Sequence, residues 1–268
     1  MRRLFLSLLG LLLLEACAAR NPPSPSSVST LEGEIIVFAA ASLTDPFQEL
    51  AARFQQEHPG VKVTFNFAAS SILRTQILQG APADLFASAD EKNMEEVVQA
   101  GRVAEGPWIF ATNRLVVVTP ASSPAGIMAL RDLARPGLRL ALPGPEVPIG
   151  AYAREVLARA SKDPAYGSDF AERVLGNVAS SEPNVKAALA RVALGEADAA
   201  LVYRSDVTPA YQGKVRVVEI PDPLNVIARY PIALLKEASH PAAARAFVEL
   251  LRSPRGREIM QRWGFGAP

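Results

Sequence analysis

Hydroxyl side chains stand at the ends of three apolar stretches of this sequence, where their spacing could serve chemistry. They belong to Ser42, Ser70 and Tyr203. A hydroxyl beside the first turn of a helix can hold a small anion together with backbone N–H groups that lack partners inside the helix. A plainer interpretation remains open: such serines commonly cap helices or form turns, and tyrosines commonly pack with a tethered hydroxyl. The positions of these residues in the sequence do not distinguish an anion-binding site from these structural roles.

The groups that an enzyme would need are missing from the usual patterns. The two histidines, His58 and His240, each precede a proline at the expected border of a helix, where a polar turn residue is ordinary. The sequence contains no His-x-x-x-His, Cys-x-x-Cys, Gly-x-Ser-x-Gly, Walker or Gly-x-Gly-x-x-Gly pattern. We therefore expect no catalytic residue, no cofactor and no resident metal ion.

Alternating strands and helices must position the three hydroxyls. Such alternation predicts an α/β fold with a parallel sheet and helices on both faces, in which ligands bind at the carboxyl ends of the strands. Asp45, Asp90 and Asn184 can each cap a helix that follows. The polar segment 162–176 has no clear period and is expected to be a surface excursion. The strands are expected at residues 34–41, 61–66, 83–88, 114–120, 139–143, 199–203 and 230–235.

The amino terminus has the layout of a secretory signal. Arg2 and Arg3 precede a short apolar run that is too brief to span a bilayer, which predicts a signal peptide over residues 1–16. The next residue, Cys17, is the only cysteine, so no disulfide is expected. It follows a stretch that resembles the lipobox of bacterial lipoproteins, although Glu15 is unusual there; a lipid anchor and an ordinary buried thiol both remain open.

Composition limits the partners. Residues 17–33 are rich in proline and serine, which is typical of a solvated tether. The chain has 28 basic and 27 acidic residues, and removal of 1–16 takes away two basic residues and one acidic residue, leaving equal numbers. This balance argues against a nucleic-acid partner, which needs clustered excess positive charge. The remaining length fits one large domain or two lobes.

Five segments of the chain resemble a known family. They are similar to the periplasmic molybdate-binding proteins of ABC transporters, and the resemblance extends from Glu34 to Phe265. The segments at 37–44 and 80–90 are the most specific to that family. The five segments are Val37–Thr44, Phe67–Leu73, Gly80–Asp90, Pro143–Ala153 and Leu201–Asp206.

The resemblance implies a fold and an arrangement of domains. It implies a two-lobed periplasmic-binding-protein fold, each lobe a mainly parallel sheet flanked by helices, with the ligand in the cleft between them. Lobe 1 would hold residues 34–113 plus 225–268, and lobe 2 would hold residues 114–224.

The resemblance also implies a binding site. The hydroxyls of Ser42 and Ser70, the amides of Ile149 and Val185, and the phenol of Tyr203 would hold molybdate or tungstate in a closing cleft. A monomer outside the cytoplasmic membrane, anchored through a lipid on Cys17, would then deliver the anion to an ABC permease. Ile149 stands where the family often has alanine, and residues 162–176 lengthen the second lobe.

Other functions remain as alternatives at this point. A binding protein of the same kind could take sulfate, phosphate or a ferric ion, although ferric sites favour clustered tyrosines and this chain has five without an adjacent pair. A two-lobed enzyme would need a base or a metal site, and a sensor domain would need an attached signalling segment.

Overall fold

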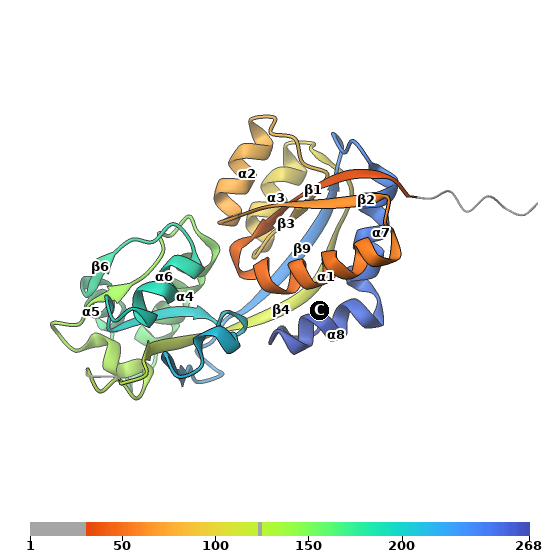
Figure 1. The fold of residues 1–268 in the computed structure, drawn as a ribbon. Helices are drawn as coiled ribbons and strands as arrows, with labels where there is room; N and C mark the ends of the chain where they lie inside the picture. Colours follow the sequence, from red (N-terminus) through yellow and green to blue (C-terminus); the bar gives the residue numbers. More distant parts are fainter. Residues whose placement is uncertain (1–30, 123–124) are drawn as a thin grey trace, which may run out of the picture.

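Two long strands join two α/β lobes in the computed structural model, which describes residues 31–122 and 125–268 (Figure 1). The predicted signal peptide 1–16, Cys17 and most of the predicted tether 17–33 lie outside the described residues. At the end of that tether, Gly33 already belongs to the first strand.

The first lobe is built around a strand whose two faces are both covered. This strand, β1, pairs in parallel with β2 on one side and with β3 on the other, and its sequence is apolar from Ile35 onward because helices cover both faces of the sheet. β9 continues the sheet beyond β3 but runs antiparallel to it. The bounds of these strands are β1 Gly33–Ala40, β2 Val61–Ala68, β3 Leu85–Ala87 and β9 Ile227–Leu235.

Side chains alternate between the two faces along each strand, so both faces of this sheet carry apolar side chains and both are covered by helices. Phe38 and Phe86 point to the face covered by α2 and α3, whereas Phe47 of α1 and Phe247 of α7 pack together in the core on the other face, with ring centroids 6.1 Å apart. The helices of this lobe are α1 Thr44–Glu57, α2 Ser70–Leu78, α3 Glu91–Gln99, α7 Pro241–Arg252 and α8 Pro254–Arg262.

The second lobe repeats the arrangement on a smaller scale. β5 pairs in parallel with both β6 and β7. Its strands are β5 Leu140–Ala141, β6 Val178–Ser180, β7 Ala199–Tyr203 and β8 Val215–Glu219, and its helices are α4 Pro148–Ser161, α5 Phe170–Gly176 and α6 Val185–Ala193.

The two lobes share the long strand β4 (Val103–Pro120). Its first part pairs antiparallel with β9, and its last part pairs antiparallel with β7 and β8. The parallel pairs are confirmed in each lobe, but the antiparallel pairs make the whole sheet mixed. Sequence patterning located only the end of β4, because Glu105, Gly106 and Pro107 interrupt the apolar run at its beginning.

Several expected elements need correction. Asp45 does not cap α1, whose N-cap is Leu43 without a side-chain hydrogen bond. The segment 162–176 is not wholly irregular, because it contains α5, whose Phe170 and Val174 are fully buried. The elements β6, β8 and α8 also form where no element was expected.

Two predicted caps are confirmed. Asp90 accepts a hydrogen bond from the backbone N–H of Asn93 at 3.0 Å and so starts α3. Asn184 accepts one from the backbone N–H of Ala187, also at 3.0 Å, and starts α6. These caps fix where the helix termini lie relative to the strands.

Candidate functional site

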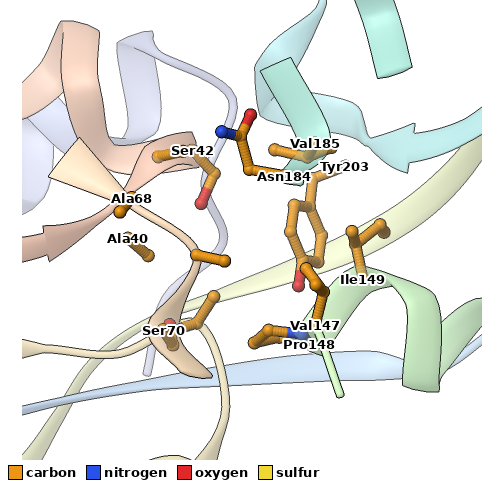
Figure 2. A pocket seen from close by; sticks show the side chains of 13 residues that line it. Ala40, Ser42, Ala68, Ser70, Val147, Pro148, Ile149, Asn184, Val185 and Tyr203 are labelled. Carbon is orange, nitrogen blue, oxygen red and sulfur yellow. The ribbon is translucent and has the colours of Figure 1, made fainter. Parts of the chain in front are cut away.

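A pocket lies between the two lobes, and all five residues predicted from the sequence line it (Figure 2). It contains about 220 Å³ of empty space, part of it open to solvent. None of the described residues that line it carries a charged side chain. The lining residues are Ala40, Ala41, Ser42, Ala68, Ala69, Ser70, Ala89, Val147, Pro148, Ile149, Asn184, Val185 and Tyr203.

The first lobe contributes two buried serine hydroxyls. Ser42 lies in a short 3-10 helix, Ala41–Leu43, directly after β1, and Ser70 is the first residue of α2. The Ser70 Oγ accepts a hydrogen bond from the backbone N–H of Ala89 at 3.0 Å, so its own proton remains available to the pocket. The Ser42 Oγ lies 3.1 Å from the hydroxyl of Tyr230. Both serines are thus held in place by other parts of the first lobe.

The second lobe contributes the starts of two helices. Ile149 is the second residue of α4 and Val185 is the first residue of α6. Backbone N–H groups in the first turn of a helix have no partner inside the helix and lie at the positive end of its dipole. Both helices begin at the pocket, so these amides are suited to a negatively charged ligand.

The start of α4 depends on the absence of a side chain at Gly150. A Cβ there would lie 2.0 Å from the carbonyl oxygen of Gly144 and 2.5 Å from that of Pro143. Arg154 links the same parts, because its guanidinium donates to the carbonyl oxygens of Pro143 and Gly150, each at 2.9 Å. This close packing of the 143–144 turn against the helix positions the Ile149 amide.

Tyr203 brings a hydroxyl that has no partner. The residue ends β7, is 1% exposed and points into the space between the lobes (Figure 2). Its buried hydroxyl has no hydrogen-bond partner among the described residues. Burial raises its pKa well above the ordinary value, so the phenol stays a neutral donor. A buried hydroxyl without a partner is costly, which points to a ligand that would accept its hydrogen bond.

One ion pair spans the lobes beside this pocket. The Lys186 ammonium of α6 lies 2.6 Å from the carboxylate of Asp45 in α1. This is the contact that Asp45 makes instead of capping its own helix. Because the two charges neutralise each other, Lys186 does not place an unpaired positive charge at the pocket.

Comparison with known proteins shows which family this chain belongs to. Residues 35–266 match the family described as bacterial extracellular solute-binding protein. The chain belongs to this family. The molybdate-binding protein of Mycobacterium tuberculosis is 40% identical over 256 residues, covering 95% of this chain and 93% of the relative. That of Escherichia coli is 37% identical over 241 residues, covering 87% of this chain and 89% of the relative.

Solved structures confirm the two-lobed fold of this solute-binding protein. The periplasmic molybdate-binding protein of Azotobacter vinelandii has a TM-score of 0.75 and 22% identity, covering 87% of this chain and 99% of that one. The sulfate-binding protein SubI of Mycobacterium tuberculosis has a TM-score of 0.78 and 21% identity, covering 87% and 86%. The resemblance noticed in the sequence is confirmed, and the chain is a solute-binding protein rather than an enzyme.

A buried carboxyl group stands behind Tyr203 in this solute-binding protein. Asp206 is fully buried, and one of its oxygens accepts a hydrogen bond from the backbone N–H of Tyr203 at 3.1 Å. Its other oxygen has no partner within residues 31–122 and 125–268. Burial raises the pKa of Asp206 to about 7, against the opposing effect of Lys186.

Sequence reasoning missed part of the pocket. Asn184 was recognised only as a cap, and its side-chain oxygen is indeed occupied by that role. Val147 and Pro148 also line the pocket, but an apolar turn gives no signal of a polar ligand. Tyr230, which contacts Ser42, lies in an apolar strand and could not be distinguished from an ordinary core tyrosine.

Proposed function

We propose that this solute-binding protein captures molybdate or tungstate in the pocket between its lobes and delivers the anion to an ABC permease. The observation that carries the proposal is the buried Tyr203 hydroxyl, which has no partner within 31–122 and 125–268, in a pocket whose described lining residues are uncharged. Support for the chemical class comes from relatives at 40% and 37% identity that are named molybdate-binding proteins.

The proposed ligands come from both lobes. Ser42 and Ser70 donate hydroxyl protons from the first lobe, while the amides of Ile149 and Val185 and the phenol of Tyr203 donate from the second. Five neutral donors around a tetrahedral dianion form charge-assisted hydrogen bonds that burial strengthens. Without a fixed positive charge in contact with the anion, release requires only that the lobes separate.

Lobe closure is the proposed means of capture. We place the lobe boundaries at residues 34–113 plus 225–268 for lobe 1 and 114–224 for lobe 2. The first crossing then falls inside β4, and the second falls two residues before β9 begins. A change in the relative orientation of these two strands would open the pocket, and the closed form would present the surface that the permease recognises.

The proposed cellular setting follows the sequence of the amino terminus. Residues 1–16 act as a signal peptide, Cys17 becomes the lipidated first residue, and 17–33 tether a monomeric two-lobed protein outside the cytoplasmic membrane. Mass spectrometry of membrane-extracted protein tests the anchor: acyl chains on Cys17 are expected, and an intact free thiol there would contradict it.

Sulfate is the anion that the test must distinguish from molybdate, although the named relatives favour molybdate. Sulfate and molybdate are both tetrahedral dianions, so pocket size must distinguish them. Calorimetric titration of residues 34–268 with molybdate, tungstate, sulfate and phosphate decides the matter. Tight molybdate and tungstate binding with weak sulfate binding is expected; tight sulfate binding, or none of molybdate, would refute the proposal.

A further inference from the structure

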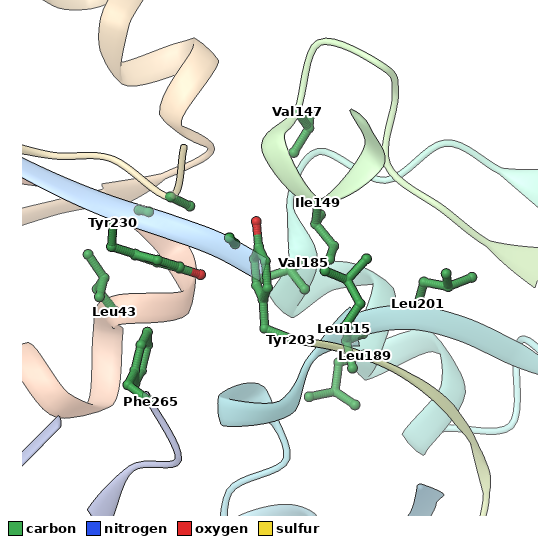
Figure 3. Close-up of a cluster of buried hydrophobic side chains, with 14 of the residues drawn as sticks. Leu43, Leu115, Val147, Ile149, Val185, Leu189, Leu201, Tyr203, Tyr230 and Phe265 are labelled. Atoms are coloured by element: carbon green, nitrogen blue, oxygen red, sulfur yellow. The ribbon is translucent and has the colours of Figure 1, made fainter. Parts of the chain in front are cut away.

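Tyr230 lies behind the pocket rather than in its lining. It belongs to β9, is 0% exposed, and its ring packs against Tyr203 and Phe265 with centroid distances of 5.7 and 5.3 Å (Figure 3). Its hydroxyl lies 3.1 Å from the Ser42 Oγ, and distance alone leaves either atom as the donor. The direction of this hydrogen bond decides where the Ser42 proton can go.

Burial decides that direction. Tyr230 is fully buried, and the hydrogen-bond partner of its hydroxyl among the described residues is the Ser42 Oγ. If Ser42 donated to Tyr230, the phenol proton would be buried without an acceptor, which is costly.

The proton of Tyr230 is therefore left for Ser42. Burial raises the pKa of Tyr230 well above its ordinary value, so the phenol keeps its proton. A fully buried O–H needs an acceptor, and the Ser42 Oγ is the acceptor that the described contacts provide. Once the Ser42 oxygen accepts from Tyr230, its own proton is free to point into the pocket.

We propose that Tyr230 is a positioning residue that turns the Ser42 hydroxyl into a donor toward the bound oxyanion. The inference rests on the proposed function and adds an explanation of how the Ser42 hydroxyl is oriented to donate its proton to the anion. Ser70 obtains the same polarity from a backbone N–H, which can never reverse. Ser42 depends on the Tyr230 hydroxyl instead, and that hydroxyl can be removed without changing a residue that lines the pocket.

A double-mutant cycle tests the inference on the folded protein, with molybdate affinity measured by calorimetry. Tyr230→Phe keeps the packed ring and removes the hydroxyl, so we expect about tenfold weaker binding. In a Ser42→Ala background the same substitution should change affinity by less than about twofold, because the group it positions is already gone. A purely structural effect would instead lower affinity by the same factor in both backgrounds.

A stability measurement and a control complete the test. Thermal unfolding of Tyr230→Phe without ligand should show a folded protein, so that any loss of affinity is not a loss of fold. Tyr166→Phe removes a phenol that packs against Phe170 in the second lobe and should leave affinity unchanged.

The outcomes separate this inference from the proposed function. If the unmutated protein binds no molybdate, the proposed function fails and the inference fails with it. If the unmutated protein binds but Tyr230→Phe binds equally well, or loses the same factor in both backgrounds, only the positioning role is overturned.

Discussion

The two walls of the pocket hold their hydrogen-bond donors in different ways. In the first lobe, Ser42 and Ser70 are each engaged with the protein, through Tyr230 and through the Ala89 backbone. In the second lobe, the Tyr203 hydroxyl has no partner among the described residues, and the amides of Ile149 and Val185 lie at helix starts. The protein orients the hydroxyls of the first wall without a ligand, whereas the phenol of the second wall has no partner in the described part of the chain and would gain one from a bound ligand.

Because of this difference, we expect the two lobes to contribute to anion binding in different ways. Donors that are already oriented add affinity without further ordering, so the first lobe is suited to meet the anion first. Donors without a partner gain a hydrogen bond when the anion binds, so contacts from the second lobe should contribute most to stabilising the closed form. Substitutions on the two walls should consequently affect stability and affinity in different proportions.

The largest effect is expected at Gly150, on the second wall. A Cβ there would lie 2.0 Å from the Gly144 carbonyl oxygen, and backbone atoms cannot move aside easily. Gly150→Ala should lower the free energy of unfolding by about 2–4 kcal/mol and weaken anion binding, because the start of α4 must shift. Chemical denaturation and calorimetry measure both.

Gly176→Ala is the matched control for that prediction. Its Cβ would meet nothing within 4 Å, so stability should be unchanged or slightly higher. Equal stability of the two variants would show that the 143–144 turn does not constrain α4.

Tyr203→Phe should separate affinity from stability. The hydroxyl has no partner in the part of the chain that the structure describes, so its removal should not lower the free energy of unfolding of the ligand-free protein. Molybdate binding should weaken by about 2–3 kcal/mol, because a charge-assisted hydrogen bond is lost. Thermal unfolding with and without molybdate measures both quantities at once. A variant that is equally destabilised in both conditions would contradict the unsatisfied state of this phenol.

Ser70→Ala should instead lower stability and affinity together. The substitution leaves the buried N–H of Ala89 without its acceptor, which costs about 1–2 kcal/mol in the free energy of unfolding, and also removes one anion donor. Ser71→Ala, next in the chain but outside the pocket lining, provides the control. If Ser70→Ala lost affinity but kept its stability, the proposed difference between the two walls would be wrong.

The sequence predicted most of the fold because its strongest signals are local. The buried runs that became β1 and β7, and the caps Asp90 and Asn184, depend on neighbouring residues only. The antiparallel course of β4 and β9 depends on pairing between segments far apart in the chain, which no local pattern encodes.

The residues of the candidate site also differ in how far the sequence alone could identify them. Ser42, Ser70 and Tyr203 stand at strand ends, where position suggested anion contact, but family resemblance was needed to single them out and to add two amides. Asp206 and Tyr230 were missed because their roles come from burial and from distant partners, and neither is visible in a sequence.

Asp206 makes the second wall sensitive to pH. Its pKa in the folded protein is about 7, above the value near 4 of an unfolded aspartate. Stability conferred by the protonated group is fully present below about pH 4 and is lost as the pH rises through 7, because the folded state holds the proton longer. Asp206→Asn keeps an acceptor for the Tyr203 N–H and should be about 1–2 kcal/mol more stable than the unmutated protein above pH 8.

Unfolding measured across this pH range checks that prediction. The unmutated protein should lose stability between pH 4 and 7 relative to Asp206→Asn, whose own profile lacks this contribution. Parallel profiles would mean that Asp206 is charged in the folded protein throughout the range.

The smallest effect is expected at the ion pair that joins the walls. Asp45 and Lys186 have side chains that are 34% and 24% exposed, so water and salt weaken their attraction. Asp45→Asn should reduce molybdate affinity by less than about 1 kcal/mol at low salt and by almost nothing at high salt. Glu57→Gln, which breaks pairs with Arg53 and Arg255 inside the first lobe, is the control. Only a pair that spans the lobes stabilises closure, so an equal loss in both variants would show that this ion pair does not link the walls.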